Sequence, residues 1–144
     1  MEVKWAMWAK DAVVEKDGSL IIWRAYDTAG WDEFPVIAKL FVVISCDVSA
    51  SEYGQVKIIG YRLIDYDGNI ILDYDEEWTV PEKLGAMRFG WSFFTDIEEV
   101  ELPRPGYYQL EILIGGEPKI EIPLNVIKIE EEEYDEEDKE PEDN

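Results

Sequence analysis

Short runs of apolar residues, many of them β-branched or aromatic, recur along the chain between Gly, Pro and Asp. Within most runs apolar and polar residues alternate, which is typical of β-strands that bury one face. No stretch combines a helical period with capping residues at its ends. The pattern therefore predicts an all-β protein, either a sandwich or a barrel.

The runs predict strands over residues 3–9, 12–15, 19–26, 35–47, 55–66, 69–74 and 106–114, with a return strand that carries residues 120–126. Asp17-Gly18, Asp67-Gly68 and Gly115-Gly116 predict tight turns between neighbouring strands. Residues 35–47 are apolar on both alternations, which predicts a central strand that is covered on both faces.

Two segments do not fit this pattern. Residues 28–32 contain Gly30 between small and polar residues, and we expect a loop there. Residues 76–92 are interrupted by Pro81, Gly85 and Gly90 and form the least regular part of the chain. Such a long excursion in a compact domain often carries a function.

The distribution of charge divides the chain into two parts. The net charge is -21, and residues 130–144 hold eleven acids and one lysine, which is about half of it. A segment of this composition cannot bury apolar surface. We predict a β-sandwich domain over residues 1–129 and a disordered or extended acidic tail over residues 130–144.

The composition also excludes classes of function. The chain has no histidine, so Ser-His-Asp and Cys-His catalysis and the usual zinc sites are absent. Cys46 has no second cysteine to pair with and is expected to be a small buried residue. We expect a protein that is not an enzyme and that needs no cofactor.

The excess of acids opposes contact with phosphate groups, so we expect no nucleic acid and no membrane among the partners. The start of the chain shows no apolar signal-peptide core, and no run is long enough to span a membrane. We therefore expect a cytoplasmic protein.

Four stretches carry a resemblance to a known family: DAVVEKDGSLIIWRAYDTAG, FPVIAKLFVVISCDV, YRLIDYDGNII and VELPRPGYYQLEILIGGEPKIEIPLNV. In their order they resemble small prokaryotic immunoglobulin-like β-sandwich proteins of unknown function. The resemblance covers residues 10–127 and implies an antiparallel sandwich of about seven to nine strands. It implies no catalytic residues.

The stretch DYDGNIILDYD, residues 65–75, is a candidate calcium loop. Five residues fall at the ligand positions of an EF-hand loop: Asp65, Asp67, Asn69, Asp73 and Glu76. Ile70 stands where that loop needs glycine, and strand-like residues precede it. We therefore expect a hairpin turn with solvated carboxylates and no resident metal, and we keep Asp65, Asp67 and Asn69 as candidate ligands of an adventitious calcium ion.

The six tryptophans offer a candidate contact surface. Trp31 lies in the expected loop, and Trp78 and Trp91 lie at the two ends of the irregular segment. Tryptophans most often fill a core or close its ends, but exposed ones bind sugars or protein partners. Trp5 and Trp8 differ by three positions, so we expect them on opposite faces of one strand.

The expected function is that of a non-catalytic binding or assembly protein. Its partner is expected to be another protein or a second copy, and a basic protein would be drawn to the acidic surface and tail. The alternative is a module that binds a carbohydrate or another small ligand through Trp31, Trp78 and Trp91.

Overall fold

The computed structural model describes residues 1–17, 19–82 and 90–130, and within these ranges the protein is all-β, with one short 3-10 helix at Ala50–Glu52. The strands are β1 (Glu2–Trp8), β2 (Asp11–Val14), β3 (Leu20–Trp23), β4 (Thr28–Trp31), β5 (Val36–Asp47), β6 (Val56–Asp65), β7 (Ile70–Thr79), β8 (Gly90–Leu102), β9 (Gly106–Ile114) and β10 (Glu117–Lys128). The all-β prediction is confirmed.

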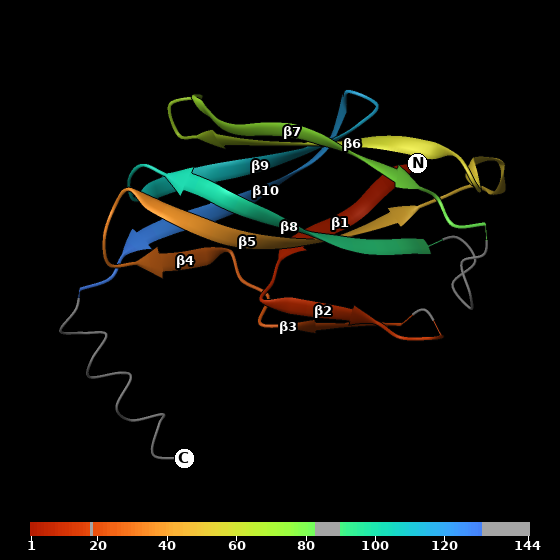
Figure 1. Ribbon diagram of the computed structural model, residues 1–144, viewed down its shortest axis with the longest axis horizontal. Helices are drawn as coiled ribbons and strands as arrows, with labels where there is room; N and C mark the ends of the chain where they lie inside the picture. Colours follow the sequence, from red (N-terminus) through yellow and green to blue (C-terminus); the bar gives the residue numbers. More distant parts are fainter. Residues whose placement is uncertain (18, 83–89, 131–144) are drawn as a thin grey trace, which may run out of the picture.

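The strands form two main sheets and a separate hairpin (Figure 1). One sheet has the order β1-β5-β8, and the other has the order β4-β10-β9-β6-β7. The pair β2-β3 stands apart as a two-stranded antiparallel hairpin. Most pairings are antiparallel, whereas β4 runs parallel to β10.

The main core lies between the two large sheets. The inward side chains of β6, Ile59, Tyr61 and Leu63, are each no more than 1% exposed, as their alternation predicts. They join the buried residues of β5, β8, β9 and β10 in one hydrophobic cluster. Because the cluster fills the space between two facing sheets, the domain is a β-sandwich.

The β2-β3 hairpin covers the outer face of the three-stranded sheet. Ala9, Ala12 and Val43 form a second buried cluster there, and partly buried side chains that include Trp5 and Phe41 pack against it. The central strand β5 is therefore buried on both faces from Leu40 to Cys46, whereas Ile37 and Lys39 are exposed, so the prediction for residues 35–47 is confirmed for the second part of the strand only. Trp8 lies in the main core and Trp5 in the second cluster, so the expected opposite orientations are confirmed.

The prediction of a loop over residues 28–32 is wrong. Thr28–Trp31 form β4, which pairs with residues 125–128 of β10. The partner strand is far away along the chain, so local sequence signals do not reveal it. A side chain at Gly30 would displace Ile129, whose Cδ1 lies 2.6 Å from the point that a Cβ atom would occupy, and glycine avoids this collision.

The irregular segment is shorter than the sequence suggests. β7 continues through residues 76–79 and β8 begins at Gly90, so only residues 80–89 separate the two strands, and residues 83–89 lie outside the described ranges. β8 itself was not predicted. A bulge disturbs its alternation near Glu99, whose φ of 56° is in the left-handed region.

Residues 131–144 also lie outside the described ranges, so the acidic tail stays a prediction. In the part of the chain that the structure describes, no helix is long and apolar enough to cross a membrane.

Candidate functional site

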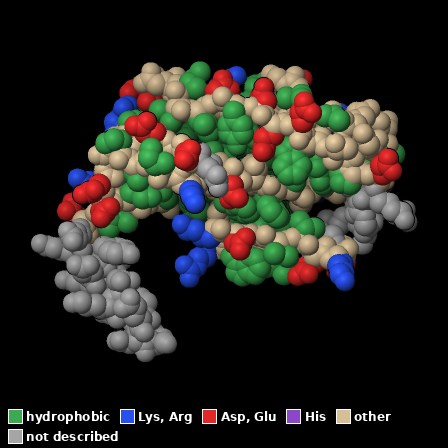
Figure 2. Space-filling model, viewed as in Figure 1, with side chains coloured by type: hydrophobic (Ala, Val, Ile, Leu, Met, Phe, Trp, Pro, Cys, Tyr) green, Lys and Arg blue, Asp and Glu red, His purple; other side chains and the backbone are tan. Residues whose placement is uncertain are grey.

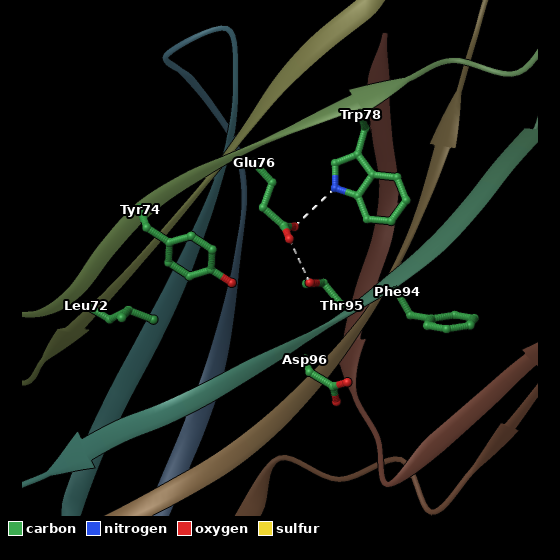
Figure 3. Close-up of a pocket in the computed structure, with 7 residues that line it drawn as sticks. All are labelled: Leu72, Tyr74, Glu76, Trp78, Phe94, Thr95 and Asp96. Atoms are coloured by element: carbon green, nitrogen blue, oxygen red, sulfur yellow. Dashed lines mark hydrogen bonds between the residues drawn. The ribbon is translucent and has the colours of Figure 1, made fainter.

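A groove of about 770 Å³ runs between β7 and β8, where the edges of the two large sheets face each other. The lining residues are Leu72, Tyr74, Glu76, Trp78, Phe94, Thr95 and Asp96. Figure 3 shows Tyr74, Glu76 and Trp78 projecting from β7 toward β8. They share this direction because alternate residues of a strand lie on the same face.

Glu76 lies at the centre of the groove and is held by both strands. The indole N–H of Trp78 donates to its Oε1 at 3.1 Å, and the hydroxyl of Thr95 donates to its Oε2 at 3.1 Å (Figure 3). A carboxylate can accept about four hydrogen bonds, which is more than these two donors supply. The carboxylate is thereby fixed in position and can still accept a hydrogen bond from a ligand.

The electrostatic field of the groove is negative. Burial, together with the charge of Glu76, raises the pKa of Tyr74 to about 12, and the charge of Asp96 acts in the same direction. Burial and the nearby Glu76 also raise the pKa of Tyr61, whose ring lies 5.1 Å from that of Tyr74. No lysine or arginine lines the groove within the described residues. A cation is the species that this field favours.

The buried hydroxyl of Tyr61 has no hydrogen-bond partner of good geometry among the described residues. Tyr61 is directly across from Tyr74 in the pairing of β6 with β7, and it is fully buried. A buried hydroxyl without a partner is rare in folded proteins. The Tyr61 hydroxyl is close enough to Glu76 for that carboxylate to raise its pKa, so it adds a buried polar group behind the groove.

The two strands that flank the groove are sheet edges. Within the described ranges β7 pairs only with β6 and β8 pairs only with β5, so each strand has one unpaired side. On the outer face of β7 the exposed residues Asp73, Asp75 and Glu77 form a row of acids. An extended segment could add to either edge.

The three tryptophans proposed as a contact surface do not come together. Trp78 and Trp91 are neighbours, with ring centroids 6.1 Å apart, and both contact Phe93. Trp91 is only 8% exposed and belongs to the core, whereas the partly exposed Trp78 lines the groove. Trp31 lies in β4, at the opposite edge of the five-stranded sheet, and lines a different cavity.

Asp65 stabilises the turn between β6 and β7. Its carboxylate accepts hydrogen bonds from the backbone N–H groups of Asp67 and Asn69 and from the side-chain amide of Asn69. Arg104 reaches both Asp65, at 3.4 Å, and Asp67, at 2.9 Å. Among the described residues no group of three or more acidic or thiol side chains is placed to hold a metal ion.

The hydrogen bonds outweigh burial at Asp65. Burial opposes ionisation of this carboxyl, but the donors of Asn69 and Asp67 and the charge of Arg104 together lower its pKa. At Cys46 the opposite holds, because burial raises the pKa of the thiol to about 12. Cys46 is therefore a packing residue, in agreement with the sequence interpretation.

Sequence reasoning missed most of the groove. The sequence predicts Glu76 only as a calcium ligand and Asp96 only as a solvent-facing carboxylate, and it does not single out Tyr74 or Thr95. The signal was present in the alternation of Leu72, Tyr74, Glu76 and Trp78 along one face. It was overlooked because the strand was expected to end at residue 74.

Comparisons with known proteins identify similarity but no activity. No curated protein matches this chain. One matching solved structure is the Pseudomonas fluorescens alkylpurine DNA glycosylase AlkC, bound to DNA containing an abasic site analog. The two chains are 11% identical with a TM-score of 0.47, and the match covers 70% of this chain and 28% of the glycosylase.

One expectation is corrected at this point. Nucleic acid is not excluded as a partner, because that exclusion rests on the net charge alone. Net charge is a sum over the whole chain, and it hides local groups of lysine and arginine. The similarity itself does not assign DNA binding to this protein.

A family model gives the remaining finding. The model of a family of unknown function, DUF6941, matches residues 4–127, which is nearly the whole described part of the chain. The family description gives no activity, substrate or partner. By this match, the chain belongs to the family of unknown function DUF6941.

Proposed function

We propose that this protein is a non-catalytic binding module that holds an extended, basic segment of a partner protein in the β7-β8 groove. The observation that carries the proposal is the fixed carboxylate of Glu76 in a groove that has aromatic walls and no lysine or arginine among its described lining residues.

The ligand chemistry follows from the lining. A lysine or arginine side chain would pair with Glu76, the charge of Asp96 would add to the attraction, and the faces of Tyr74 and Trp78 would attract the same cation. The unpaired edges of β7 and β8 offer backbone groups to an added strand. The carboxylates select the charge of the segment, and the strand edges favour its extended form.

A sugar platform has less support. Stacking against a sugar ring needs exposed aromatic faces, but Trp91 is buried and Trp31 lies at another edge. Trp78 alone remains in the groove, and its indole N–H is already bonded to Glu76.

The finer fold class belongs to the same proposal. We assign the sandwich to the immunoglobulin-like class, and the contact between Tyr108 and Arg104 supports this. The hydroxyl of Tyr108, near the start of β9, donates at 2.6 Å to the carbonyl of Arg104, four residues upstream. This arrangement resembles the tyrosine corner of immunoglobulin-like domains. A cytoplasmic location is also proposed, with the reduced, buried Cys46 as support.

The test uses the full chain and synthetic extended peptides that differ only in charge. Calorimetry should detect binding of a lysine- and arginine-rich peptide and no binding of its glutamate-rich counterpart. Glu76→Gln should weaken binding by at least about tenfold, the loss expected for one charged hydrogen bond.

Glu77→Gln is the matched control. It removes the same charge one residue away, but its side chain lies on the outer face of β7. Equal losses from both variants would reduce the effect to unspecific attraction and would refute the groove as the site.

A further inference from the structure

A second cavity, of about 300 Å³, lies at the opposite edge of the five-stranded sheet and is cationic. Lys10, Arg24, Tyr26 and Trp31 are among its lining residues, together with the rest of β4. Figure 2 shows Lys and Arg side chains gathered at the root of the β2-β3 hairpin, on a surface where acids are otherwise scattered. The cavity is therefore positively charged, whereas the whole chain is negatively charged.

The two cations have no counterions in the described structure. Among the other described cations, Lys4, Lys57, Arg62, Arg104 and Lys119 form ion pairs, whereas Lys16, Lys39 and Lys128 form none. For Lys10 and Arg24 no described carboxylate lies within ion-pair distance, and the Nζ of Lys10 instead lies 5.1 Å from the ring centre of Tyr26. In a chain with a net charge of -21, two unpaired cations at one cavity mark a place for an anion.

The backbone of Arg24 has an unusual conformation. Its φ is 53°, in the left-handed region that residues with a side chain rarely adopt. Such conformations cost free energy and gather at binding sites. Here the unusual conformation occurs at the end of β3, where the chain turns toward Tyr26.

The chain itself supplies an anionic segment at this position. The backbone N–H of Ile129 donates to the carbonyl of Trp31 at 3.0 Å, so the chain leaves the fold beside a lining residue of the cavity. The residues that follow, 131–144, include ten acids and one lysine. A segment of this length can reach at most about 45 Å, and it begins two residues after Ile129.

We propose that the acidic C-terminal segment, residues 131–144, binds in cis to the cationic cavity formed by Lys10, Arg24, Tyr26 and Trp31. Attachment at Ile129 gives the segment a millimolar effective concentration at the cavity, so individually weak ion pairs suffice. β4 has an unpaired side within the described ranges, so the segment can also pair with its backbone.

The test is zero-length cross-linking of the full chain with a carbodiimide, which joins lysine amines to carboxylates. Mass spectrometry should find Lys10 joined to residues 131–144 several times more often than Lys16. Lys16 is the matched control because it is an exposed lysine at the tip of the same hairpin. About 1 M salt should abolish the difference, since it screens charges beyond roughly 3 Å.

Two further arms make the outcome decisive. Arg24→Gln should lower the Lys10 yield, and Lys16→Gln should leave it unchanged. In a mixture of isotope-labelled and unlabelled protein, a cis contact gives cross-links within one isotope only, and mixed cross-links would overturn the proposal in favour of a second copy.

Equal yields at Lys10 and Lys16 would also overturn it. If Arg24→Gln then abolished retention of a single-stranded oligonucleotide, the cavity would be a nucleic-acid site. The β7-β8 groove is not involved in this experiment, so the two proposals can fail separately.

Discussion

The indole N–H of Trp78 donates a hydrogen bond of 3.1 Å to the carboxylate of Glu76, two residues away on the same face of β7. The indole of Trp78 thus lines the groove and also fixes the position of the Glu76 carboxylate. Phe93 supports the indole from the core side, with ring centroids 4.9 Å apart. The charge of the groove is therefore positioned by the hydrophobic core.

Trp78→Phe should weaken the binding of a basic peptide severalfold without unfolding the protein. Phenylalanine keeps an aromatic wall but cannot donate to Glu76, which then loses one of its two fixed contacts. Calorimetry measures the affinity. Trp23→Phe is the control, because Trp23 is 46% exposed on the hairpin, and an equal effect there would contradict the role of Trp78.

Glu76→Gln should lower the pKa of Tyr74 from about 12 toward its ordinary value of 10.0, without reaching it, because burial remains. The raised pKa means that the folded state favours neutral Tyr74. Its contribution to stability is therefore complete below pH 10.0 and is lost as the pH rises toward 12.

Tyrosinate absorbance measures this titration, with Tyr74→Phe to identify the signal and circular dichroism to show that the fold persists. Glu77→Gln should leave the titration almost unchanged. A Tyr74 titration that did not respond to Glu76→Gln would mean that the charge of Glu76 does not act on Tyr74.

Tyr108→Phe should reduce the free energy of unfolding by about 1 kcal/mol, since it removes a hydrogen bond and leaves the carbonyl of Arg104 without its donor. Denaturant unfolding measures the loss. The neighbouring Tyr107 is 44% exposed, so Tyr107→Phe should cost much less. Similar losses from both would argue against the corner contact.

Asp65→Asn should lower stability at neutral pH and reduce the loss of stability on acidification. The pKa of Asp65 is lowered in the folded state, so its contribution is present above its ordinary value of 3.8 and disappears as the pH falls through the folded value. Unfolding curves at several acidic pH values test this. The exposed Asp67, replaced by Asn, should give a smaller change, and an equal change would contradict the central position of Asp65 in the turn.

Millimolar calcium should leave the melting temperature unchanged. Both oxygens of Asp65 already accept hydrogen bonds from Asp67, Asn69 or Arg104, and calcium would have to displace these donors. Thermal unfolding with calcium and with a chelator is the measurement. A clear rise of the melting temperature with calcium would support a calcium site in residues 65–76.

Much of the sandwich was predictable because its signals are local. The turns at Asp67-Gly68 and Gly115-Gly116 use glycines with a positive φ, as their sequences indicate. The alternation of Tyr108, Leu110 and Ile112 correctly gave the buried face of β9. The residues that favour a tight turn and the alternation of buried and exposed residues in a strand both depend on neighbouring positions in the sequence.

The rest depended on distant partners. In β4, the side chain of Ile129 packs against Gly30. In β8, a bulge near Glu99 interrupts the alternation of buried and exposed residues. The groove lies between β7 and β8, which belong to different sheets. No spacing of residues in the sequence therefore predicts it. The sequence groups Trp31, Trp78 and Trp91 as one contact surface, and only their places in the sheets show that Trp91 is a core residue and that the other two line different cavities.

The exposed acids of β7 also determine what this protein does in a concentrated solution. Asp73, Asp75 and Glu77 repeat at every second position, so two copies that met edge to edge would bring like charges together. Self-assembly into fibres through β7 is therefore opposed while these carboxylates are ionised. This row of acids therefore opposes pairing of β7 with the β7 edge of a second copy.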